Sequence, residues 1–236
     1  MGTRPTHFPG GLSNTAPGDN LYQFPYLDPM QYNVWFSDFN KYVKADWTVT
    51  KTTTSSTDAI VTGDGGILQF QCATLDDNLI AAQWDGNSGA AVVENFLFDS
   101  TKYMFMKTRL KISDADAADI AIGLQITDTS PGAVSDGIFF ELTDGDATVT
   151  LEVEKNGTAS TQAAGDLTDD TYHTFGFAYI PGTGFQVFFD NALAGTITST
   201  TNAPDDEELA ISIAMQSGAV AGTTMSVDYL LIAKER

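Results

Sequence analysis

Short runs of alternating apolar and polar residues fill the chain from Trp47 onward. The runs are rich in Val, Ile, Thr, Phe and Tyr, and Gly, Asp, Asn and Ser gather between them, which is the pattern of many strands joined by turns. The 3.6-residue period of an amphipathic helix is nearly absent. Strands are predicted in the segments IAIGLQIT, GIFFELT, HTFGFAYI, FQVFFD, ELAISIAMQ and TMSVDYLLIAKE.

Two segments indicate which side chains face a core. In DATVTLEVEKNGT, Val149, Leu151 and Val153 share one face, and Asn156-Gly157 predicts a type I′ hairpin turn. The segment KYMFMKTRLKI alternates likewise, and its inward face is predicted to hold Met104, Met106, Thr108, Leu110 and Ile112.

Two packed antiparallel sheets bury the inner faces of so many short strands, because each sheet covers the apolar side of the other. The sequence therefore predicts an all-β protein, an antiparallel β-sandwich of the jelly-roll kind with eight to fourteen strands. One short helix is expected at FSDFNKY, with Ser37 or Asp38 as its cap. Residues 37–236 form the predicted sandwich domain, and residues 1–36 an extended N-terminal arm.

The arm has no strand pattern but is rich in proline and in large apolar side chains. Disordered segments are normally poor in aromatic residues, because these stabilise a fold wherever a protein surface can cover them. Three states remain open: a solvated tail, an arm folded back on its own sandwich, and an arm that clasps a neighbouring subunit. The residues expected to make such contacts are Phe8, Leu12, Tyr22, Phe24, Tyr26, Tyr32, Trp35 and Phe36.

The chain of 236 residues carries a net charge of -20. Nucleic-acid binding requires basic side chains that neutralise phosphates, so no DNA or RNA partner is expected. No apolar run follows Arg4 and none is long enough for a membrane helix, so neither a signal peptide nor a membrane partner is predicted. The single cysteine, Cys72, is expected to be a buried residue on a strand.

The order of the segments TKYMFMKTRLKI, IAIGLQI, GIFFEL, YHTFGFAYIPGTGFQVFFDNALAGTI and MSVDYLLIAKER resembles the concanavalin A-like, or laminin-G-like, sandwich. The segments GTRPTHFPGGLSNTAP and YNVWFSDFNKYVKADWTVT are similar to the openings of virion proteins of tailed bacteriophages, notably podoviruses of cyanobacteria. This resemblance implies a capsid decoration, or cement, protein. Such a protein assembles in the host cytoplasm, sits on the capsid exterior, binds the major capsid protein and is expected to be a homotrimer.

Some relatives of this fold are glycosidases, whose catalytic carboxylates follow the spacing Glu, any, Asp, two of any, Glu on one strand. That spacing is absent here. Glu141 and Asp144 would fall on opposite faces of a continuing strand, and Glu152 and Glu154 are predicted to lie on a solvated face. No nucleophile elbow is found either, so the chain is not expected to be an enzyme.

Metal and cofactor sites are not predicted. His173 is the only histidine after the arm and is expected to pack at the start of a strand. Asp114, Asp116 and Asp119 do not fit a calcium loop, which would need Gly at its sixth position and Glu at its twelfth.

A second function remains open, a carbohydrate-binding module on the capsid or tail. Concanavalin A-like sandwiches often hold glycans with aromatic residues, and the contact residues expected here are Trp84, Asp85 and Asn87. The competing interpretation of Trp84 is a core tryptophan that ends a strand.

Overall fold

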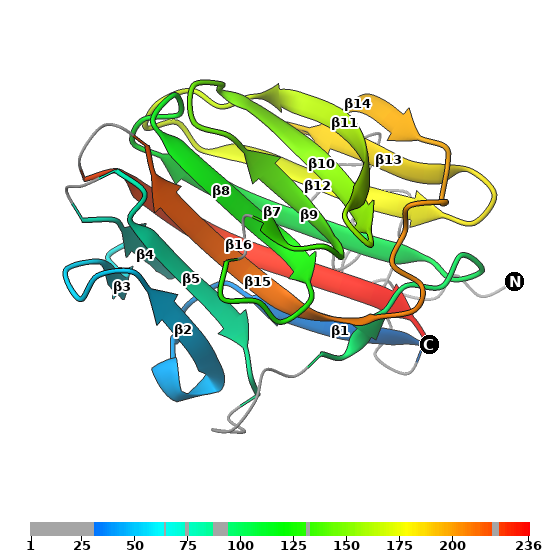
Figure 1. The fold of residues 1–236 in the computed structure, drawn as a ribbon, viewed down its shortest axis with the longest axis horizontal. Helices are drawn as coiled ribbons and strands as arrows, with labels where there is room; N and C mark the ends of the chain where they lie inside the picture. Colours follow the sequence, from blue (N-terminus) through cyan, green and yellow to red (C-terminus); the bar gives the residue numbers. More distant parts are fainter. Residues whose placement is uncertain (1–30, 64, 74–75, 87–93, 131–132, 219–221) are drawn as a thin grey trace, which may run out of the picture.

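Two antiparallel sheets packed face to face make up the computed structural model (Figure 1). The structure describes residues 31–236 apart from residues 64, 74–75, 87–93, 131–132 and 219–221. Each sheet has eight strands, so the predicted antiparallel β-sandwich is confirmed. The sixteen strands of the described residues exceed the predicted eight to fourteen, because short strands also line the sheet edges.

Sheet A has the order β14-β13-β12-β7-β16-β4-β3, with β1 also paired to β16. In Figure 1 the blue β1 runs beside the red β16. The strands of sheet A are β1 (Tyr32–Ser37), β3 (Thr57–Val61), β4 (Ile67–Gln71), β7 (Met104–Ile112), β12 (His173–Ile180), β13 (Gly184–Phe189), β14 (Ala192–Ile197) and β16 (Thr224–Glu235).

Sheet B has the order β11-β10-β9-β8-β15-β5-β2, with β6 also paired to β15. Its strands are β2 (Trp47–Lys51), β5 (Leu79–Trp84), β6 (Phe96–Leu97), β8 (Ala118–Gln125), β9 (Gly137–Leu142), β10 (Thr148–Lys155), β11 (Thr158–Asp166) and β15 (Glu208–Ser217).

The main core lies between the two sheets and takes one face of nearly every strand. The predicted inward face of β7 is confirmed, since its alternate residues from Met104 to Ile112 are all buried. Thr108 is the polar member of this set, and its hydroxyl donates to the carbonyl of Tyr229 at 2.9 Å. The predicted hairpin is also confirmed: β10 pairs with β11, and Asn156 and Gly157 have the positive φ angles that a type I′ turn requires.

The boundary predicted after residue 36 needs correction, because β1 begins at Tyr32 and pairs with β16 from Tyr32↔Glu235 to Ser37↔Leu230. Tyr32, Trp35 and Phe36 therefore belong to the sandwich and not to an arm. Five other residues predicted to make arm contacts lie outside the described residues: Phe8, Leu12, Tyr22, Phe24 and Tyr26.

The helix predicted at FSDFNKY is wrong. The Ser37 hydroxyl accepts a hydrogen bond from the Phe39 amide at 3.1 Å, and Asp38 accepts one from the Asn40 side chain at 2.6 Å. These local bonds stabilise a turn, which Phe39 completes with a φ of 51°. Only a three-residue 3-10 helix, Lys44–Asp46, follows. Within the described part of the chain, no helix has the length and apolar character to cross a membrane.

Cys72 is buried as predicted but lies directly after β4 and not on a strand. Burial raises the pKa of its thiol to about 11, which disfavours the reactive thiolate. His173 matches its predicted position at the start of a strand, β12. His173 stacks on Phe189 with ring centroids 5.0 Å apart, and its Nδ1 lies 2.9 Å from Asp190. The Thr168 amide donates to Nε2 at 3.3 Å, so the imidazole holds the β13–β14 turn against the start of β12.

Candidate functional site

All three tryptophans of the chain meet at one edge of the sandwich. Trp35 comes from β1 of sheet A, whereas Trp47 and Trp84 come from β2 and β5 of sheet B. Their ring centroids lie 5.8 Å (Trp35–Trp47), 5.6 Å (Trp35–Trp84) and 5.3 Å (Trp47–Trp84) apart. The interplanar angles of 89°, 69° and 83° are edge-to-face arrangements, which aromatic pairs favour.

The register of the strands produces this cluster. β2 and β5 are antiparallel, and Trp47 lies directly opposite Trp84 in the ladder, where side chains on one face contact each other. Trp35 reaches the same place from the other sheet because β1 pairs with the second half of β16, beyond the part of β16 that pairs with β4. Trp47 is only 6% exposed, while Trp35 and Trp84 are half-buried against the core.

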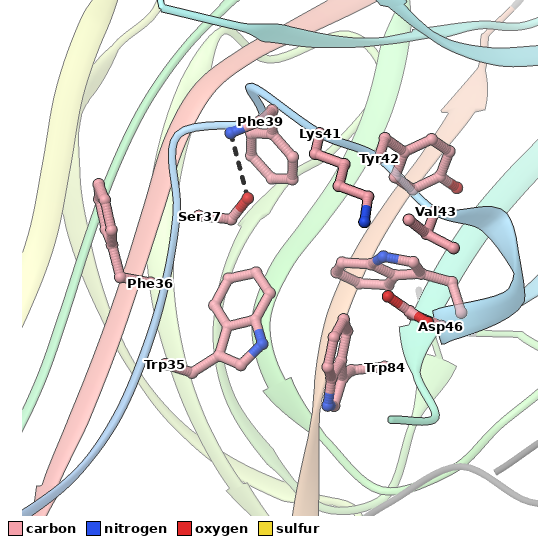
Figure 2. Close-up of a pocket in the computed structure, with 10 residues that line it drawn as sticks. Trp35, Phe36, Ser37, Phe39, Lys41, Tyr42, Val43, Asp46 and Trp84 are labelled. Carbon is pink, nitrogen blue, oxygen red and sulfur yellow. Dashed lines mark hydrogen bonds between the residues drawn. The ribbon is translucent and has the colours of Figure 1, made fainter. Parts of the chain in front are cut away.

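A cavity of about 160 Å³ opens beside these rings. We call it the tryptophan pocket, and its walls are the three tryptophans and the loop of residues 36–46. In Figure 2, Trp35 and Trp84 stand on its lower side, Lys41 extends toward it from the loop, and the Asp46 carboxylate points inward. Phe39 and Tyr42 close it from above in the same view.

Asp58 of β3 holds the loop in place. Its fully buried carboxylate accepts hydrogen bonds from Lys51 at 2.6 Å, Lys44 at 3.0 Å and the Tyr42 hydroxyl at 2.9 Å. Burial acts to raise the pKa of Asp58, but these hydrogen bonds outweigh it and keep that pKa below its usual value. Burial and the nearby Asp58 charge raise the pKa of Tyr42. The anchor therefore fixes two loop residues, Tyr42 and Lys44, on either side of Val43.

Several polar groups of the pocket are free to bind a ligand. None of the three indole N–H groups has a hydrogen-bond partner in the structure as described, although a buried tryptophan usually finds one. The Lys41 ammonium and the Asp46 carboxylate form no ion pair with any described residue. The Ser37 hydroxyl accepts from the Phe39 amide and keeps its own proton to donate.

The residues predicted for glycan contact have different positions. Trp84 ends β5 and packs against the core, as the interpretation of a core tryptophan predicts, and it also lines the pocket. Asp85 is buried, and its carboxylate accepts a hydrogen bond from Thr48 at 3.4 Å, which directs it away from the pocket lining. Asn87 lies outside the described residues.

Sequence reasoning missed Trp47, Lys41 and Asp46 as pocket residues and placed Trp35 and Phe36 in the arm. No local motif joins them, because the three tryptophans are brought together by strand pairing and not by spacing. The one available signal is that all three tryptophans lie before residue 85.

A second group of polar residues lies on the outer face of sheet B. Glu141 of β9 and Glu152 of β10 form a pair of neighbouring carboxyl groups, with Asp119 and Glu154 nearby. Burial, the interaction with Glu152 and the repulsion from these carboxylates raise the pKa of Glu141 to about 8. The solvated face predicted for Glu152 and Glu154 is therefore partly wrong, since both are half-buried. Asp144 follows the end of β9, so that strand does not continue to it.

Among the described residues, no group of three or more His, Cys, Asp or Glu side chains is arranged to hold a metal ion.

Solved structures with this fold include carbohydrate-binding and carbohydrate-cleaving proteins. A glycoside hydrolase family 16 enzyme of the mixed-linkage glucan locus of Bacteroides ovatus has a TM-score of 0.59 and 13% identity, over 84% of this chain and 99% of the enzyme. The carbohydrate recognition domain of Emp46p has a TM-score of 0.55 and 12% identity, over 80% and 88%. An endo-1,3-β-glucanase from Streptomyces sioyaensis has a TM-score of 0.58 and 12% identity, over 89% and 99%.

These likenesses define the class of the fold: a concanavalin A-like jelly-roll sandwich of the type found in family 16 glycoside hydrolases. At such low identity they show the fold alone. No model of a known protein family matches the chain. No curated protein sequence matches it either.

Proposed function

We propose that this protein is a glycan-binding module whose binding site is the tryptophan pocket. The observation that carries the proposal is the convergence of all three tryptophans on one cavity where their N–H groups have no partner among the described residues. Binding does not require hydrolysis, and the carboxyl pair on sheet B takes no part in it.

The chemistry of the pocket suits a sugar ring. The C–H face of a pyranose is apolar and packs on an indole, while its hydroxyl groups both donate and accept hydrogen bonds. The pocket offers the indole walls and, around them, the Lys41 ammonium, the Asp46 carboxylate and the Ser37 hydroxyl. Polar atoms and apolar ring faces both contribute substantially to the lining, which suits a ligand that is itself part polar and part apolar.

The fold neighbours give weaker support. One is a carbohydrate recognition domain and two act on glucans, and these ligands belong to those proteins. Their relevance is that this sandwich serves carbohydrate ligands in more than one way.

Intrinsic fluorescence tests the proposal directly, because every tryptophan of the chain lines the pocket. The protein is screened on a glycan array, and each hit is titrated in solution. We expect a change in tryptophan emission that saturates, and a loss of array binding in Trp84→Ala while circular dichroism shows a folded protein. Tyr103→Ala, at an exposed aromatic residue directly before β7 and outside the pocket lining, is the control that keeps binding. Silence on the array and in the titrations would refute the proposal.

The capsid-decoration role remains a second proposal. It is supported by the resemblance of the opening segments and by Phe36, whose ring is 58% exposed on the edge strand that continues the N-terminal segment. In this proposal, residues 1–31 clasp a neighbouring subunit of a homotrimer or the major capsid protein on the virion exterior. Deletion of residues 1–30 should reduce cosedimentation with capsids and leave the sandwich folded. Equal retention of the truncated protein would exclude the clasp.

A further inference from the structure

We infer that the tryptophan pocket takes one uncharged sugar ring, the terminal unit of its glycan, and that Lys41 and Asp46 together select that ring against charged sugars. The inference rests on the proposed function and specifies its ligand. It follows from the size of the cavity, from the two charges that line it, and from the charge of the whole protein.

The volume of the pocket limits its occupant. Sites for drug-sized ligands measure about 300–1,000 Å³, and the tryptophan pocket measures about 160 Å³. The loop of residues 36–46 closes one side, and Phe39 stands over the cavity in Figure 2. The volume is that of one sugar ring, and because the pocket is open to solvent on its other side, the following units of a glycan would lie outside it.

The two charged side chains of the lining balance each other. Neither Lys41 nor Asp46 pairs with the other or with any residue that the structure describes. The backbone of Asp46 is held by two hydrogen bonds, its amide to the Val43 carbonyl and its carbonyl from the Asp85 amide, both at 2.9 Å. These bonds fix the main chain of Asp46 at the wall of the pocket.

A neutral ring satisfies both charges, because one hydroxyl donates to Asp46 while another accepts from Lys41. A uronic acid would bring its carboxylate toward Asp46, and an amino sugar would bring its ammonium toward Lys41. Each charged ligand gains one contact and suffers one repulsion, whereas a neutral ring gains both contacts and suffers no repulsion. The net charge of -20 also repels acidic glycans at long range, which weakens their binding further.

The test is a panel titration followed by tryptophan fluorescence. The probes are the methyl glycosides of glucose, galactose and mannose, the corresponding uronates, and the corresponding 2-amino sugars. We expect at least one neutral glycoside to bind and its charged counterparts to bind roughly tenfold more weakly, the size of one charge-assisted hydrogen bond. A trisaccharide ending in the preferred sugar should bind within about threefold of the simple glycoside, a difference of less than one ordinary hydrogen bond.

Two charge variants separate selection from a structural role. Asp46→Asn should bring the uronate to within about threefold of the neutral glycoside, and Lys41→Gln should do the same for the amino sugar. The controls are Asp146→Asn and Lys102→Gln, outside the pocket lining, which should leave the order of affinities unchanged.

The outcomes are distinct. Charged and neutral sugars that bind equally well, or variants that weaken all probes by the same factor, would overturn the inference and leave the proposed function standing. Affinity that rises steeply with chain length would overturn the single-ring part. Absence of binding by every probe, together with a silent glycan array, would overturn the proposed function itself.

Discussion

Asp58 is the residue that anchors the tryptophan pocket, because two of its three hydrogen-bond donors, Tyr42 and Lys44, belong to the loop beside the pocket. In Asp58→Asn the new amide has nearly the shape of the carboxylate. It lacks the negative charge that pairs with Lys51 and Lys44. Removing one partner of a buried ion pair costs about 3–5 kcal/mol, and the partial exposure of both lysines places the expected loss in free energy of unfolding at about 2–3 kcal/mol. Urea denaturation measures it.

The same variant should weaken sugar binding, since Tyr42 and Lys44 lose their anchor. The matched control is Asp146→Asn at an exposed loop position, where we expect less than about 0.5 kcal/mol. If Asp58→Asn unfolds at the same urea concentration as the wild type, Asp58 does not hold the loop.

Glu141 predicts a pH dependence of stability. Its pKa is raised from 4.5 to about 8 in the folded protein, so between these values the folded state holds a proton that the unfolded state releases. The contribution of this group is therefore present below pH 4.5 and is lost as the pH rises through about 8. In Glu141→Gln, whose amide is uncharged at every pH, that loss should disappear.

Urea unfolding of both proteins from pH 5 to pH 9 gives the comparison. We expect the difference in free energy of unfolding to shift steadily in favour of Glu141→Gln as the pH increases. Parallel pH profiles would show that Glu141 does not hold a proton in the folded state.

Among the secondary-structure elements, the long strands could be predicted from the sequence, whereas short strands such as β1 could not. β7 and β10 alternate cleanly because each has one face in the core, so both their existence and their inward residues could be predicted. β1 carries apolar side chains on both faces and is half-buried along most of its length, which removes the alternation that identifies a strand. The helix expected at residues 36–42 failed because Ser37 and Asp38 bond the next turn of backbone and do not cap a helix.

Two glycines give an element-scale prediction. Gly157 has a φ of 72° at the β10–β11 turn and open space around it, so Gly157→Ala should cost about 1 kcal/mol of stability through backbone strain alone. Gly176 on β12 has ordinary backbone angles, but an added Cβ would lie 2.2 Å from the Met106 carbonyl oxygen. Gly176→Ala should therefore be the more damaging change, because a neighbouring strand would have to move.

Thermal and urea unfolding of the two variants rank them. The opposite order, or a Gly157→Ala protein as stable as the wild type, would contradict the assigned turn and register.

At the scale of the whole molecule, the sandwich could be predicted and the pocket could not. Periodicity determines which residues face the core, and this is local information. The pocket requires the pairing of β2 with β5 and of β1 with β16, which brings Trp35 and Trp84 together across 49 positions of sequence. Trp84 was found because it stands beside polar turn residues, and Lys41 and Asp46 were missed because nothing near them in sequence marks a site.

Glycan binding in the tryptophan pocket is measured most directly by a ¹⁵N NMR titration. It follows the indole N–H signals, of which the chain has three. With a glycan identified on the array, we expect these signals to shift progressively and to saturate together, while the amide signals of β9 and β10 around Glu141 do not shift. Indole signals that do not move, with shifts gathered instead on the outer face of sheet B, would contradict it.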